Sequence, residues 1–104
     1  MPNTRIQYRP KTDPGQPQLM PPRRYAVVLL NDDYTPMDFV VMVLTDIFRL
    51  PHTRAAAVML LVHHEGRGVC GVFQKDIAES KCLQVQECAA EAGYPLKCIV
   101  EPAV

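Results

Sequence analysis

The sequence predicts a small α/β (α+β) domain, a two-layer sandwich in which three helices cover one face of a three-stranded sheet. A chain of 104 residues has room for one core. Short apolar runs alternate with longer segments of helical periodicity, in the order strand, helix, helix, strand, helix, strand. We expect mostly antiparallel pairing, because a purely parallel sheet this small would need helices on both faces. The long connections leave several strand orders open.

Residues 1–24 are predicted to form a flexible N-terminal extension. This segment is rich in proline and poor in large apolar side chains, so it can neither propagate a helix nor bury enough surface to fold. From Tyr25 onward the chain is dense in apolar residues, and the core domain is therefore predicted to span residues 25–104.

The first strand is expected at Tyr25–Leu30, an apolar run that leads into the polar turn 31–34. Thr35 is predicted to cap the helix that follows, with Pro36 in its first position. Apolar residues then recur at helical spacing, and we expect this helix to end near Leu50, because the residue before a proline avoids helical geometry.

The second helix is predicted to be capped by Thr53, to run from Ala55 to Glu65 and to end at Gly66 in a left-handed conformation. A strand should follow at Val69–Phe73. Apolar residues in both of its alternating sets suggest burial on more than one side.

The third helix is expected to begin at Asp76 and to stop at Gly93. Its apolar residues recur at alternating intervals of four and three residues and so share one face of the helix; they are Ala78, Cys82, Val85, Ala89 and Ala92. Alternation from Leu96 to Glu101 predicts a last, half-exposed strand.

Charge and apolar patterning exclude several classes of function. Eleven basic residues balance eleven acidic ones, so no general field attracts nucleic acid or an anionic membrane. No apolar run is long enough to cross a bilayer, and the N-terminus does not resemble a secretion signal. We therefore expect a monomeric protein of the cytoplasm that binds neither nucleic acid nor membrane.

The cysteines and histidines give no support for a metal site or a cofactor. The four cysteines lack the paired spacings of zinc sites, and we expect buried structural thiols in a reducing compartment. His63 and His64 are adjacent, so they point about 100° apart on a helix and cannot both serve one metal as an i, i+4 pair would. Without a nucleophile elbow or a phosphate loop, no residue is predicted to be catalytic.

The turn Asn31-Asp32-Asp33 places an amide and two carboxylates beside an apolar helix. Taken alone, it is most simply an Asx-type turn, although paired carboxylates also suggest a metal or acid/base site. Apolar residues nearby are most simply core residues. They would wall a pocket only if the ends of both helices flank the turn; these residues are Met37, Val40, Met59, Val62 and Leu96.

The run NDDYTPMDFV at 31–40 resembles the signature of the ClpS family, the adaptors of the bacterial ATP-dependent Clp protease. Four further blocks are similar and follow in the family's order, at 59–66, 70–73, 78–81 and 94–98. The likeness extends from Tyr25 to about Glu101.

This resemblance implies a non-enzymatic adaptor that binds N-degrons, substrates whose first residue is Leu, Phe, Tyr or Trp. Asn31, Asp33 and His63 match the residues that hold the substrate's α-amino group. At neutral pH that group is mostly an ammonium and needs acceptors. For His63 to accept a bond it must be neutral at that nitrogen, which predicts weaker binding in mild acid.

The resemblance also assigns the side-chain pocket and the protease partner. Asp32 and Thr35 match positions lining the site, and the apolar pocket corresponds to Met37, Val40, Met59, Val62 and Leu96, with Met37 as a gate against β-branched residues. Lys81 matches a contact to a ClpA-type AAA+ unfoldase, and Asp76 stands where the family often has Glu. Two alternatives stay open: a small metal-dependent or thiol enzyme, and a generic interaction module without a terminal-amine pocket.

Overall fold

The computed structural model describes residues 22–103. Most of the predicted N-terminal extension, residues 1–21, therefore lies outside the described residues, as does Val104. Residues 22–24 are exposed and belong to no helix or strand. Within residues 22–103, no helix combines the length and apolar character that crossing a membrane requires.

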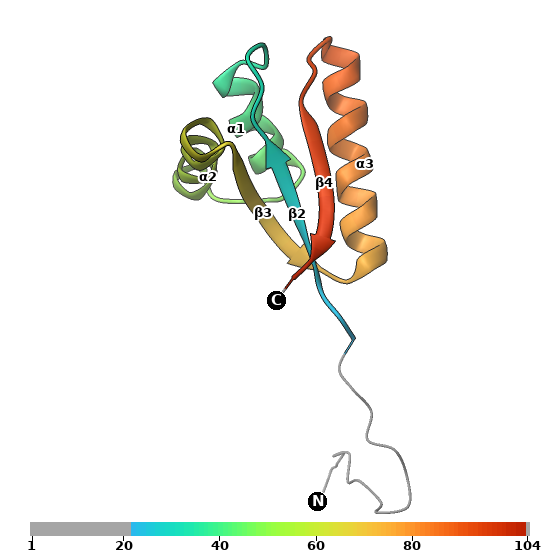
Figure 1. The fold of residues 1–104 in the computed structure, drawn as a ribbon. Coiled ribbons are helices and arrows are strands. Elements are labelled where there is room, and N and C mark those ends of the chain that lie inside the picture. The colour runs from blue at the N-terminus through green and yellow to red at the C-terminus, as the bar shows by residue number, and fades with distance from the viewer. Residues whose placement is uncertain (1–21, 104) are drawn as a thin grey trace, which may run out of the picture.

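The elements follow the predicted order and form the predicted sandwich (Figure 1). The sheet has the order β3-β2-β4, and both pairs of neighbouring strands are antiparallel. The first strand thus takes the centre, which the sequence had left open. The elements are β2 (Tyr25–Leu30), α1 (Met37–Asp46), α2 (His52–Glu65), β3 (Arg67–Phe73), α3 (Lys75–Ala92) and β4 (Lys97–Pro102).

The helices cover one face of the sheet: α2 packs on β3, α3 packs on β4 and β2, and α1 packs against α2. In the strands, Leu29 lies opposite Gly68 on β3 and Cys98 on β4, and these positions face the helices. Burial of this face supplies most of the stabilisation. The buried core includes Val27, Leu29, Val43, Leu44, Phe48, Ala55, Val58, Cys70, Ala78, Cys82, Val85, Ala89 and Cys98.

The prediction that β3 is buried on both sides is wrong. Val69 and Val72 are 43% and 39% exposed, because none of the helices in residues 22–103 covers the second face of the sheet. The alternation predicted for β4 is confirmed, with Cys98 buried and Ile99 exposed. The predicted face of α3 is buried except at Ala92, which is the exposed last residue of the helix.

The predicted threonine caps are also wrong. Helices α1 and α2 begin one residue after Pro36 and Pro51, whose carbonyl groups accept bonds from the N–H groups of Val40 (3.2 Å) and Ala55 (2.8 Å). Each proline is therefore the cap residue, and neither cap has a side-chain hydrogen bond. Thr53 lies inside the first turn of α2.

Helix α1 ends at Asp46, four residues before the predicted Leu50. Arg49 takes a left-handed conformation with φ of 59°, and the N–H of Leu50 turns back to the carbonyl of Leu44 at 3.2 Å. Arg49 thus reverses the chain three residues after the helix, in a conformation that glycine adopts more readily than a residue with a Cβ atom. The left-handed ends predicted at Gly66 and Gly93 are confirmed, with φ of 90° and 82°.

Candidate functional site

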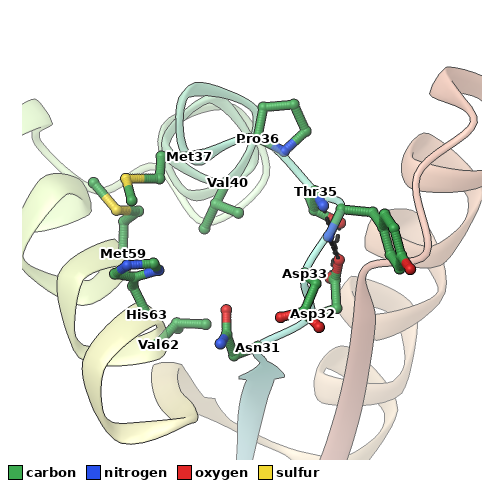
Figure 2. Close-up of a pocket in the computed structure, with 11 residues that line it drawn as sticks. Asn31, Asp32, Asp33, Thr35, Pro36, Met37, Val40, Met59, Val62 and His63 are labelled. Carbon is green, nitrogen blue, oxygen red and sulfur yellow. Dashed lines mark hydrogen bonds between the residues drawn. The ribbon is translucent and has the colours of Figure 1, made fainter.

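A cavity of about 360 Å³ opens between the β2–α1 loop, the first turn of α1 and the last turns of α2 (Figure 2). Its volume lies at the small end of the range for ligand pockets, about 300–1,000 Å³. Two segments that are separate in the sequence, 31–40 and 59–63, meet here because α1 and α2 pack against each other. The lining residues are Asn31, Asp32, Asp33, Tyr34, Thr35, Pro36, Met37, Val40, Met59, Val62 and His63.

Helix α2 contributes one wall through Met59, Val62 and His63, which are spaced i, i+3 and i+4 and so share a face of the helix. Val62 is 3% exposed, Met59 is half-buried and His63 is exposed. The wall therefore changes from apolar at its base to polar at its rim. Helix α1 adds the buried Val40 and, one turn earlier, the exposed Met37.

Gly68 on β3 lies directly behind this wall. A Cβ atom at this position would lie 2.8 Å from Cγ2 of Val62 and 3.3 Å from the carbonyl oxygen of Val58. Carbon atoms in contact are normally about 3.5–4.0 Å apart. Glycine thus lets α2 pack closely on the sheet with Val62 facing the cavity. Gly68 was not among the predicted site residues, because the strand was predicted to begin at Val69, whereas β3 begins at Arg67 and includes Gly68.

Three hydrogen bonds to Asp32 hold the loop at the cavity's edge. Its Oδ1 accepts bonds from the N–H groups of Tyr34 and Thr35, both at 2.8 Å. Its Oδ2 accepts a bond from the hydroxyl of Thr35, also at 2.8 Å. Partial burial by itself raises the pKa of the Asp32 carboxyl, but these three bonds outweigh it and hold the pKa below its usual value. The Thr35 hydroxyl thus serves this turn instead of capping α1.

A backbone bond joins the start of this loop to the end of α2. The N–H of Asn31 donates to the carbonyl of Gly66 at 2.9 Å, just where the left-handed Gly66 ends the helix. This bond holds Asn31 beside Gly66, which lies one helical turn beyond His63 on α2. Figure 2 shows Asn31 and Asp33 across the cavity from the α2 wall.

Asn31, Asp33 and His63 are exposed at the rim. In the part of the chain that the structure describes, their side chains form no hydrogen bond or ion pair with the protein. An amide oxygen, a carboxylate and an imidazole nitrogen can each accept a hydrogen bond. Together with the apolar wall, this arrangement can bind a ligand that has a cationic donor next to a bulky apolar group.

The remaining predicted site residues are not among those that line the cavity. Leu96 is 5% exposed in the core cluster and is not among the lining residues, whereas Tyr34 and Pro36 line the cavity without having been predicted. Asp76 is exposed in the first turn of α3. Lys81 donates from Nζ to the carbonyl of Ile47 at 2.8 Å, so it ties α3 to the end of α1.

Three of the four cysteine side chains are buried, and Cys88 is partly buried. No group of three or more His, Cys, Asp or Glu side chains in this range could hold a metal ion. Cys70, Cys82 and Cys98 are buried, and burial raises the pKa of Cys70 to about 12 and also raises the pKa of Cys98. Because the thiolate is the nucleophile, thiols held in the protonated form are inert.

Comparison with known proteins identifies the fold and the family. The family model of the ATP-dependent Clp protease adaptor protein ClpS matches residues 20–99. The ATP-dependent Clp protease adapter protein ClpS of Neisseria meningitidis serogroup A is 62% identical over 81 residues, which are 78% of this chain and 79% of the relative. The protein of the same name from Burkholderia cenocepacia is 54% identical over 88 residues, 85% of each chain.

A solved structure, Agrobacterium tumefaciens ClpS2 bound to L-phenylalaninamide, has a TM-score of 0.77 and 42% identity to this chain. The match covers 80% of this chain and 100% of the solved one. The chain therefore belongs to the ClpS family, the adaptor proteins of the ATP-dependent Clp protease.

Proposed function

We propose that this adaptor binds the free N-terminus of proteins that begin with Leu, Phe, Tyr or Trp and delivers them to a ClpA-type AAA+ unfoldase for degradation. One observation carries the proposal: three exposed acceptor side chains stand at the rim of a cavity that has an apolar wall and room for one bulky side chain. Binding and delivery need no chemical step on the substrate, so no catalytic residue is assigned.

The chemistry of a free chain end fits the rim. An α-amino group has a pKa of about 8, so at neutral pH it is mostly an ammonium with three N–H donors. We assign one acceptor to each donor, from Asn31, Asp33 and His63. The carboxylate of Asp33 supplies the negative charge that a desolvated cation needs. N-acetylation removes both the charge and two of the three donors.

The apolar wall fits the first side chain, which we assign to Met37, Val40, Met59 and Val62. Burial of a Leu or Phe side chain contributes about 1.5–3 kcal/mol. Hydrogen bonds to charged groups contribute about 1.5–3 kcal/mol each. Micromolar affinity corresponds to a net free energy of about 8 kcal/mol, so these contributions must also offset the entropy lost on association. The solved relative supports this assignment, because L-phenylalaninamide has a free α-amino group beside a phenylalanine side chain.

For the unfoldase we assign a separate surface on α3 that includes Asp76 and Lys81. Helix α3 contributes no lining residue to the cavity, so a substrate and an unfoldase can be bound at the same time. Because Lys81 also bonds to the end of α1, Asp76→Lys is the cleaner test of this surface. It should impair delivery while peptide affinity stays unchanged, and a loss of both would contradict separate surfaces.

A fluorescence anisotropy titration tests the terminal-amine pocket. We expect a labelled peptide that begins with Leu to bind at about micromolar concentration. The same peptide with an acetylated N-terminus should not bind, and Asp33→Ala should weaken binding of the free peptide. A generic interaction module would instead bind both peptides equally. Equal affinity for the two peptides would overturn the proposed function.

A further inference from the structure

Asp32 differs from the other polar residues of the site in what its side chain contacts. Its carboxylate already accepts three hydrogen bonds from within the loop, two from backbone N–H groups and one from the Thr35 hydroxyl. Asp33, one residue later, has no such partner in residues 22–103. Two neighbouring carboxylates of equal charge therefore have different surroundings, and Figure 2 shows Asp32 directed to Thr35.

The turn formed by residues 32–35 lies where its hydrogen bonds can affect ligand binding. The turn lies between Asn31, which is tied to Gly66 by its backbone, and Met37, the first residue of α1. Asp33 lies inside the turn itself. With both ends of the loop held by α2 and α1, the orientation of residues 33–35 depends on bonds within the loop, and Asp32 accepts three of these.

We infer that Asp32 is a positioning residue: it clamps the 32–35 turn so that Asp33 and Asn31 face the incoming amine, and its own charge does not contact the substrate. This inference rests on the proposed function and adds a division of labour between the two aspartates. If both carboxylates contacted the amine, neutralising either aspartate would weaken peptide binding.

Two conservative variants of Asp32 separate geometry from charge. Asp32→Asn removes the charge but keeps an oxygen for the N–H groups of Tyr34 and Thr35, and its amide can donate to the Thr35 hydroxyl, which rotates to accept. Asp32→Glu keeps the charge but displaces the carboxylate by one methylene and cannot form the same Asx turn. Asp33→Asn is the matched control, because it neutralises the carboxylate that we assign to the amine.

The binding assay uses the full chain and a labelled peptide that begins with Leu. We expect Asp32→Asn to bind within about threefold of the unaltered protein, and Asp32→Glu and Asp33→Asn to bind about tenfold or more weakly, as loss of a charged hydrogen bond predicts. Added salt should weaken binding to the Asp32→Asn variant as it does to the unaltered protein, and less so to Asp33→Asn. If Asp32→Asn binds the peptide as weakly as Asp32→Glu or more weakly, the inference is overturned.

Amide hydrogen exchange, measured without peptide, provides a second readout. The N–H groups of Tyr34 and Thr35 should be protected in the unaltered protein and in Asp32→Asn, and exposed to exchange in Asp32→Glu. Equal exchange in all three proteins would show that no clamp exists. If the unaltered protein fails to distinguish free from acetylated peptides, the proposed function fails, while the exchange pattern still decides whether Asp32 clamps the turn.

Discussion

Replacement of Gly68 by alanine should disturb the cavity from behind, although Gly68 does not line it. The new Cβ would lie 2.8 Å from Cγ2 of Val62, so the two carbons must separate by about 0.7 Å or more to reach normal contact. The carbonyl oxygen of Val58, also on α2, would lie 3.3 Å from the new Cβ and leaves it little room to shift. Either α2 moves away from β3, or Val62 moves into the cavity.

Overpacking of this kind costs about 1–3 kcal/mol of stability. For a domain of this size, a loss of about 2 kcal/mol lowers Tm by roughly 8–16 °C. We therefore expect Gly68→Ala to unfold at lower urea concentration and lower temperature. Its affinity should fall more for a peptide that begins with Phe than for one that begins with Leu, because the larger ring needs more of the narrowed cavity.

The matched control is Gly93→Ala, at the end of α3. Gly93 has φ of 82°, and a Cβ atom added there would meet no other atom within 4 Å, so alanine introduces backbone strain without a clash. It should cost about 1–2 kcal/mol and leave peptide affinity unchanged. The double variant Gly68→Ala/Val62→Ala, which removes the clashing methyl, should recover part of the lost stability. Unaltered stability and affinity in Gly68→Ala would refute the reasoning.

Four other predictions follow from single side chains. Met37→Ala should admit peptides that begin with Ile or Val, and unchanged discrimination in a competition assay would reject a gate. Arg49→Gly should stabilise the protein by about 1 kcal/mol in urea unfolding, since Arg49 has φ of 59°; an equal or lower midpoint would contradict this. Alkylation of the native protein should modify Cys88 first and the buried Cys70 only on unfolding, whereas simultaneous labelling would contradict the burial. Because the folded-state pKa of Asp32 is depressed, its carboxylate stabilises the protein above about pH 4, the pKa of the unfolded chain. This stability is lost as the pH falls through the lower folded-state pKa. An unfolding free energy that declines equally with pH in Asp32→Ala would contradict this.

The sequence by itself determined the features that depend on neighbours along the chain. Apolar periodicity predicted all six elements and their order, and Gly66 and Gly93 marked two helix ends because left-handed backbone suits a residue without Cβ. Local signals sufficed for the elements and these helix ends because the interactions responsible span only a few residues. The run at 31–40 and the block at 59–66, which the family resemblance marked, contain every residue that lines the cavity.

Local signals failed where two interactions competed for one residue. Thr35 is a good helix cap by composition, but its hydroxyl donates to Asp32 and Pro36 takes the cap position. The residue type was compatible with either role, and only the arrangement of its neighbours decided between them. The pocket role that the resemblance assigns to Leu96 stays a prediction; Leu96 belongs to the same core cluster as the lining residues Val40 and Val62.

The tertiary structure alone decided which elements meet across long stretches of chain. It put β2 at the centre of the sheet, left one face of β3 uncovered, and brought Gly68 behind Val62 and Lys81 against Ile47. These contacts depend on the volume and direction of side chains packed from separate elements, which no window of neighbouring residues contains. The cavity exists for the same reason, since its walls come from a loop and two helices that only packing brings together.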